Sequence, residues 1–243
     1  MSQQSIDAYD LPARVASYDA DMEIMHPNRA KMVEIALDVL PFETAAPLRA
    51  LDLGVGTGFF SARFMARFPA ARVVAIDGAR AMLDLATARF GADAARVEFA
   101  VADFRTLHDL ALTPEGFDVV YSSFALHHLS RAEKTALVRN ALALLRPGGW
   151  FVNADIVVAG SREIEARIQA LRLAGIVARA RGADPRFGTI DATRRFIDDL
   201  QARDGDQPLT LEEDLAVLRD AGVRGASVFW SELREAVCGG YKS

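Results

Sequence analysis

The chain has 243 residues, 51% of them hydrophobic and 25% charged, so it can bury a sizeable core and its composition argues against disorder. The net charge of -5 argues against an extended basic surface, and we expect no nucleic-acid partner. The start of the chain lacks a basic segment followed by an apolar one, and no apolar run approaches about 18 residues, so we expect a cytoplasmic protein without membrane contact.

Short apolar runs alternate with helical patterns from Arg49 onward, which is typical of a parallel sheet with helices on both faces. Before them, a helix is predicted near Arg29–Leu40, where Pro41 ends it. Right-handed crossovers predict an α/β fold with a doubly wound, Rossmann-like sheet. The first five strands are predicted at Ala50–Leu53, Val73–Ile76, Val97–Val101, Val119–Ser122 and Trp150–Val157.

The end of the chain departs from this alternation. Residues 158–209 carry two or three helical patterns, and a capping box beginning at Thr210 then starts the last helix, which Gly222 ends. Val223–Trp230 and Ala236–Gly239 predict a closing hairpin, which makes a seven-stranded sheet with the last strand antiparallel.

We expect a single domain over residues 1–243, with two helical additions to the sheet. Residues 1–46 form an N-terminal cap, and residues 158–209 form an insertion before the last helix. The insertion has nine arginines against eight acids, so it is either a solvated, salt-bridged surface or a lid over a substrate. A homodimer through its helices is a further expectation.

The most specific motif is the glycine loop that follows the first strand. Gly54 allows a tight turn, Gly56 removes a side chain where backbone must approach a ligand, and Gly58 allows close packing of the next helix. The glycines are spaced two apart, unlike the G-x-G-x-x-G of dinucleotide enzymes, which disfavours a nicotinamide oxidoreductase. Asp77 lies about 20 residues further on, where a carboxylate can accept ribose hydroxyls, or alternatively caps the next helix.

A third acid, Asp103, follows the third strand at the same sheet edge. At this point the sequence resembles the class I S-adenosylmethionine-dependent methyltransferases, whose first motif reads D-x-G-x-G-x-G. Residues 117–129 resemble the family's fourth-strand motif, residues 145–152 the turn into its fifth strand, and Tyr18-Asp19 an aromatic–acidic pair on its cap helix.

The resemblance implies S-adenosylmethionine as cofactor and S-adenosylhomocysteine as product. It implies that the loop glycines and Asp52 hold the methionine end, Asp77 the ribose and Asp103 the adenine amino group. The cofactor-binding residues that the resemblance implies are Tyr18, Asp52, Gly54, Gly56, Gly58, Asp77, Met82, Asp103, Phe104 and Ser122.

Methyl transfer from a sulfonium is an in-line displacement, so the enzyme must align donor and acceptor and exclude water. His127, in the loop after the fourth strand, is the candidate base or acceptor contact, and Asp155 is the other candidate. Either residue could instead cap or pack a local turn. For His26, we expect a role at the start of a helix.

A small-molecule acceptor is expected. The residues predicted to line its pocket are Tyr18, Met22, Met25, Phe124 and Trp230, with Arg172 and Arg179 as candidate carboxylate ligands. No metal spacing is present, so we expect no metal. Two alternatives remain open, namely carboxymethyl-type transfer from a modified S-adenosylmethionine and a catalytically silent binding module.

Overall fold

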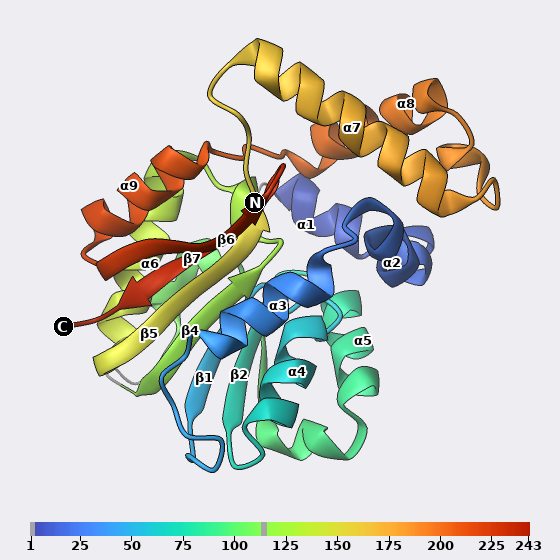
Figure 1. Ribbon diagram of the computed structural model, residues 1–243. Coiled ribbons are helices and arrows are strands. Elements are labelled where there is room, and N and C mark those ends of the chain that lie inside the picture. The colour runs from blue at the N-terminus through green and yellow to red at the C-terminus, as the bar shows by residue number, and fades with distance from the viewer. Residues whose placement is uncertain (1–2, 113–115) are drawn as a thin grey trace.

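The computed structural model of the protein describes residues 3–112 and 116–243 (Figure 1), so the first two residues of the expected cap lie outside the described residues. Within them, seven strands form one sheet in the order β3-β2-β1-β4-β5-β7-β6. The strands are β1 Arg49–Leu53, β2 Arg72–Asp77, β3 Val97–Val101, β4 Phe117–Ser123, β5 Leu145–Ile156, β6 Arg224–Glu232 and β7 Glu235–Tyr241.

The first five strands run parallel, and β7 pairs antiparallel with both β5 and β6. The sequence-based prediction of a doubly wound sheet with an antiparallel last strand is therefore confirmed. The strand order reverses between β1 and β4, and this switch point opens a crevice at the carboxyl ends of the strands.

Helices cover both faces of the sheet. Figure 1 shows α3, α4 and α5 on one side, and α6 and α9 on the other. The helices are α1 Gln3–Tyr9, α2 Pro12–Met25, α3 Arg29–Asp38, α4 Phe59–Arg67, α5 Arg80–Phe90, α6 Arg131–Leu144, α7 Arg162–Ala180, α8 Ile190–Asp204 and α9 Leu211–Ala221.

Alternation along the strands produces two cores. In β1, Ala50 packs into the cluster under α3, α4 and α5, whereas Leu51 and Leu53 pack into the cluster under α6 and α9. The two outer helices of the second face are joined by a buried ion pair, with Lys134 Nζ 2.8 Å from Asp214 Oδ1. Both faces of the sheet are therefore covered by helices and buried, as is usual for parallel strands.

The insertion forms a third apolar cluster with the N-terminal cap. Met25 of α2 packs with Leu173 and Ile176 of α7 and with Ile197 of α8. Figure 1 shows α7 and α8 stacked on α1 and α2, beside the carboxyl edge of the sheet. The cap and the insertion therefore lie together over one end of the sheet.

Local sequence sets the helix ends. Thr210 and Glu213 exchange the two hydrogen bonds of a capping box at the start of α9, and Gly222 ends that helix in the left-handed conformation at φ 105°, both as predicted. Within the described residues, no helix is both long and apolar enough to cross a bilayer.

Candidate functional site

The glycine loop joins β1 to α4 at the switch point. Gly54, Gly56 and Gly58 have φ values of 79°, 52° and 77°, a region that L side chains rarely adopt. A Cβ at Gly54 would lie 2.6 Å from that of Ala125, and one at Gly58 would lie 2.7 Å from the ring of Phe90, whereas Gly56 faces open space. Two glycines thus permit close packing, and the middle one leaves room at the loop surface.

A first cavity of about 590 Å³ opens beside this loop. Seven of the ten predicted cofactor residues line it, namely Tyr18, Asp52, Gly54, Gly56, Asp77, Met82 and Phe104. Its wall also includes nine residues not predicted for the cofactor, namely Tyr9, Arg29, Val55, Phe59, Phe60, Ser123, Phe124, Ala125 and His128. The cavity is therefore partly apolar and partly acidic.

Two buried carboxylates stand in its wall. Asp52 accepts a hydrogen bond from Ser61 Oγ at 2.6 Å, and burial raises its pKa to about 7. Asp77 accepts backbone N–H groups from Gly56 at 2.8 Å and from Ala79 at 2.9 Å, and burial raises its pKa to about 6. Asp77 thus makes a local turn contact while also lining the cavity.

The other three predicted cofactor residues, Gly58, Asp103 and Ser122, are not among the residues that line the cavity. Gly58 supports the packing of α4, and Ser122 donates to the Leu53 carbonyl at 2.7 Å, which ties β4 to β1. Asp103 accepts a hydrogen bond from Arg105 Nε at 2.8 Å. Burial would raise the pKa of Asp103, but the hydrogen bonds from Arg105 outweigh burial and lower it.

The cap helix α2 is tied to the glycine loop through Asp19. Its carboxylate accepts from Thr57 Oγ1 at 2.9 Å and from Arg29 Nη1 at 2.8 Å, and it pairs with Arg89. These bonds hold the neighbouring Tyr18 over the first cavity, so the cap closes the cavity on the side away from the sheet.

A second cavity of about 470 Å³ adjoins the first, and Tyr9, Tyr18 and Phe124 line both. Its remaining walls come from α2, from the turn after β4 and from the insertion. Of the predicted acceptor-pocket residues, Met22, Met25 and Arg172 line it, whereas Trp230 instead lies under Lys31, with Nζ 4.7 Å from its ring centroid.

His127 lies in the second cavity on the 3₁₀ turn η3, Leu126–His128. Its backbone N–H donates to Asp155 at 2.9 Å, and its Nδ1 lies 2.6 Å from the same carboxylate. Burial raises the pKa of Asp155, but the charge and hydrogen bond of His127 outweigh burial and lower it to about 2. Asp155 is therefore an ionised acceptor, so Nδ1 of His127 is the donor and Nε2 is its free nitrogen.

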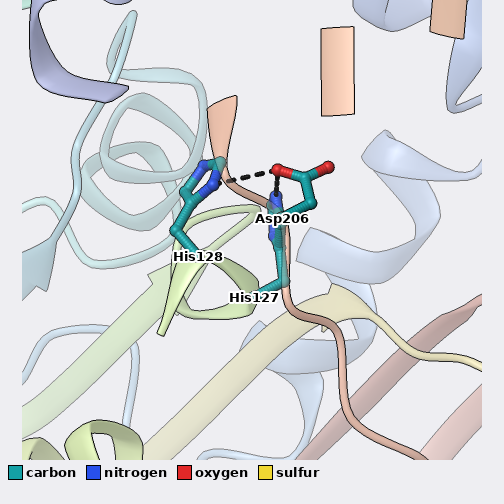
Figure 2. Close-up of side chains that lie close together, drawn as sticks. All are labelled: His127, His128 and Asp206. Carbon is teal, nitrogen blue, oxygen red and sulfur yellow. Dashed lines mark ion pairs between the residues drawn. The ribbon is translucent and has the colours of Figure 1, made fainter. Parts of the chain in front are cut away.

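Asp206, from the segment after α8, faces that second nitrogen. Its Oδ1 is 3.6 Å from His127 Nε2 and 3.0 Å from His128 Nδ1, and Figure 2 shows both rings directed at this carboxylate. Burial would lower the pKa of His127, but Asp155 and then Asp206 outweigh burial and raise it above its ordinary value. The two carboxylates therefore favour the protonated form of His127.

We call His127, His128 and Asp206 the His–Asp cluster. One ligand-type atom from each lies within 4.8 Å of the others, and in the described part of the chain this is the group that could hold a metal ion. The Asp155 contact to His127 resembles the outer-shell support of metal-bound histidines. It equally suits a histidine base that has a fixed tautomer.

Two features of this site were not predicted from the sequence. His26 is buried, with Nδ1 3.0 Å from Glu235 Oε1, and Asn28 rather than His26 begins α3, which corrects the expected helix-start role. Asp206 carries no local motif, since it reaches His127 only because the segment after α8 folds back. The only sequence signal at His26 was its position before a helix, and that signal does not indicate a buried contact with Glu235.

A doubly wound sheet with a glycine loop and two acidic strand ends around one cavity defines a Rossmann-like protein with a nucleotide-type site at its switch point. Residues 50–149 match the family described as methyltransferase domain. This match and the methyltransferase relatives described below support the resemblance to the class I S-adenosylmethionine-dependent methyltransferases.

Individual relatives match parts of the chain. The demethylmenaquinone methyltransferase of Thermus thermophilus is 35% identical over 146 residues, which are 59% of this chain and 59% of the relative. A malonyl-acyl-carrier-protein O-methyltransferase of Methylococcus capsulatus is 38% identical over 104 residues, 42% of this chain and 35% of the relative. The chain thus spans between about a third and three fifths of the length of these curated relatives.

Similarity of fold extends further than similarity of sequence. Haemonchus contortus phosphoethanolamine N-methyltransferase 2, solved in complex with S-adenosyl-L-methionine, superposes with a TM-score of 0.65 at 19% identity. The match covers 92% of this chain and 45% of that one. This likeness shows the fold.

Proposed function

We propose that the protein is an S-adenosylmethionine-dependent methyltransferase that transfers a methyl group to a small-molecule acceptor. The observation that carries the proposal is the pair of adjoining cavities at the switch point. The first has the glycine loop and Asp77 in its wall, and the second has His127. Donor and acceptor can therefore meet between Tyr18 and Phe124, which line both cavities.

The residues of the first cavity fit the cofactor. Gly56 leaves open space where the backbone must approach a ligand, and Asp77 presents a carboxylate that would accept the ribose hydroxyls. Asp52 and the loop would hold the methionine part, with Met82 and Phe104 against the adenine. When bound, the cofactor supplies a methyl group activated by the sulfonium charge.

Asp103 would bind the adenine amino group only after the pair it forms with Arg105 opens, because that arginine occupies its carboxylate. Ser122 and Gly58 would act by fixing the strand and helix around the loop. Adenine binding would therefore require a rearrangement of this ion pair, whereas Asp77, the proposed ribose ligand, already lines the cavity.

His127 is proposed as the base that takes a proton from the acceptor. Asp155 holds Nδ1–H, so Nε2 is the atom that would accept the proton. Asp206, at 3.6 Å, would stabilise the imidazolium that results. Asp155 itself is a positioning residue, because it acts through His127.

The insertion is proposed as the substrate lid. Helices α7 and α8 contribute Arg172, Ile197, Leu200, Gln201 and Asp204 to the second cavity, so an acceptor bound there is covered by the insertion rather than by solvent. Exclusion of water favours displacement at the methyl group over side reactions. Since the lid packs on α2 through an apolar cluster, it can close over both cavities together.

Calorimetric titration tests the proposal. We expect micromolar binding of S-adenosylmethionine and of S-adenosylhomocysteine, and loss of both in Asp77→Ala. The matched control is Asp84→Ala, which removes an exposed carboxylate on α5 and should leave binding unchanged. Absence of binding by the unmodified protein would refute the proposal.

Turnover distinguishes an enzyme from a silent binding module. A screen of small molecules for release of S-adenosylhomocysteine should identify an acceptor whose methylation is lost in His127→Ala while cofactor binding is retained. Intact cofactor binding together with methylation that is unchanged by His127→Ala at every pH would remove the histidine from the reaction. If S-adenosylhomocysteine is released no faster with any acceptor than by breakdown of the cofactor alone, the silent binding module is favoured.

A further inference from the structure

A third cavity of about 540 Å³ adjoins the second one on the side away from the glycine loop. Met25, His26 and Arg172 line both cavities, so these three side chains form the boundary between them. The third cavity lies between α7, the start of α3 and the turn joining β6 to β7. It therefore extends the acceptor site away from the cofactor.

Two guanidinium groups in this cavity have unused donors. Arg172 and Arg234 each carry a buried Nη1 atom without a hydrogen-bond partner among the described residues. Arg234 uses its Nε for the Val157 carbonyl at 3.1 Å and for Glu165 at 3.2 Å, and only 5% of the residue is exposed. Buried polar atoms in proteins are nearly always bonded, so this pair points to a missing acceptor of hydrogen bonds.

The two positive charges lie near one another. Burial and then the charge of Arg234 lower the pKa of Arg172 to about 10, so Arg172 remains charged at neutral pH. Arg172 makes no hydrogen bond or ion pair with any residue of the described chain. Like charges placed together at a cavity wall favour an anion between them.

Two glutamates also face the third cavity, and the charge of one of them, Glu235, acts on both Arg172 and Arg179. Glu235 is held by His26 Nδ1 at 3.0 Å, and Glu232 lies 3.6 Å from Lys31 Nζ. Arg179, also in this wall, donates its Nε to the Ile24 carbonyl at 2.8 Å and adds a further positive charge. The balance of charge facing the cavity therefore attracts a negatively charged group.

We propose that the acceptor carries a carboxylate, which Arg172 and Arg234 bind while the rest of the molecule extends through the second cavity toward His127. A carboxylate has two coplanar oxygens, which match the fork of a guanidinium better than a single point charge does. The inference rests on the proposed function, because it names the substrate class for the same site.

The test uses the protein loaded with S-adenosylhomocysteine. A panel of small carboxylic acids, each paired with its methyl ester, and inorganic phosphate are the probes, screened by thermal shift and then measured by calorimetry. We expect acids to bind at least about tenfold more tightly than their esters and than phosphate. Arg172→Met should weaken acid binding at least about tenfold, and Arg172→Lys should restore only part of it.

Controls separate this inference from the proposed function. Arg167→Met removes an exposed arginine of the same helix and should leave acid binding unchanged, and S-adenosylhomocysteine affinity should be the same in every variant. Esters that bind as well as acids, acid binding that survives Arg172→Met, a preference for phosphate, or no acid that binds would each overturn the inference while leaving cofactor binding intact. Failure of S-adenosylhomocysteine to bind would refute the proposed function itself.

Discussion

Replacing Asp155 with asparagine should reverse the direction in which the pKa of His127 is shifted. The carboxylate outweighs burial in the intact protein, so without its charge burial dominates and the pKa of His127 falls below the ordinary 6.5. The pKa of Asp155 is lowered from 3.8 to about 2 although burial alone would raise it, so each partner of the pair stabilises the charged form of the other.

The same pair makes stability depend on pH. The raised pKa of His127 contributes stability that is present below pH 6.5 and lost as pH rises through the folded-state value. The lowered pKa of Asp155 contributes stability that is present above its ordinary pKa and lost as pH falls toward 2. The free energy of unfolding should therefore differ most between the two proteins from about pH 4 to 6.5.

The measurement is an NMR titration of the histidine rings, which needs no acceptor, with the His127 signal assigned from His127→Gln. The control is Asp118→Asn, which alters a buried carboxylate at the opposite end of the sheet, where it accepts the Arg49 backbone N–H at 2.6 Å. That control should leave the His127 titration unchanged. A His127 pKa at or below 6.5 in the unmodified protein, or one that Asp155→Asn does not lower, would refute the reasoning.

Four further results are expected. Gly54→Ala should cost at least about 2 kcal/mol in urea denaturation and abolish cofactor binding, because its Cβ would lie 2.6 Å from that of Ala125 at a φ of 79°. S-adenosylmethionine affinity, measured by calorimetry, should fall as pH drops below about 6, since Asp77 has a raised pKa and is needed ionised. Lys134→Ala should lower the free energy of unfolding by about 3–5 kcal/mol, because it leaves Asp214 buried without its partner. Dialysis against a chelator should leave turnover unchanged; a loss restored by a divalent cation would make the His–Asp cluster a metal site.

The cofactor side of the molecule was predictable because its signals are local. Three glycines spaced two apart require left-handed backbone, and Asp77 falls at a strand end whose position follows from the length of one βαβ unit. Parallel pairing of β1 with β2 and with β4 then places the carboxyl ends of these three strands at the same edge of the sheet, so this arrangement follows from the fold class alone. The sequence did not indicate that the Asp103 carboxylate is bonded to Arg105, two residues away, rather than lining the cavity.

Several residues that line the second cavity were predicted, but their polar partners could not be, because these meet only through tertiary packing. His26 looked like a residue at a helix start, yet the closing hairpin brings Glu235 to its ring across 209 positions of the chain. Arg172 was a candidate carboxylate ligand together with Arg179, both among nine arginines of a charge-balanced insertion. Neither helical spacing nor charge counts indicate which of those arginines lacks a carboxylate partner, since that depends on how α7 meets the β6–β7 turn.

The place where the insertion rejoins the core explains how these two sides can function as one site. Gly205 ends α8 in the left-handed conformation at φ 70°, and this turn directs the next two residues back to the sheet. Gln207 donates its backbone N–H to the His127 carbonyl at 2.7 Å, and Asp206 beside it faces the His127 ring. A change in the length or angle of α8 therefore moves Asp206 relative to His127 while leaving the glycine loop untouched. In the proposed enzyme, a change in the insertion would accordingly alter the surroundings of His127 without altering the glycine loop.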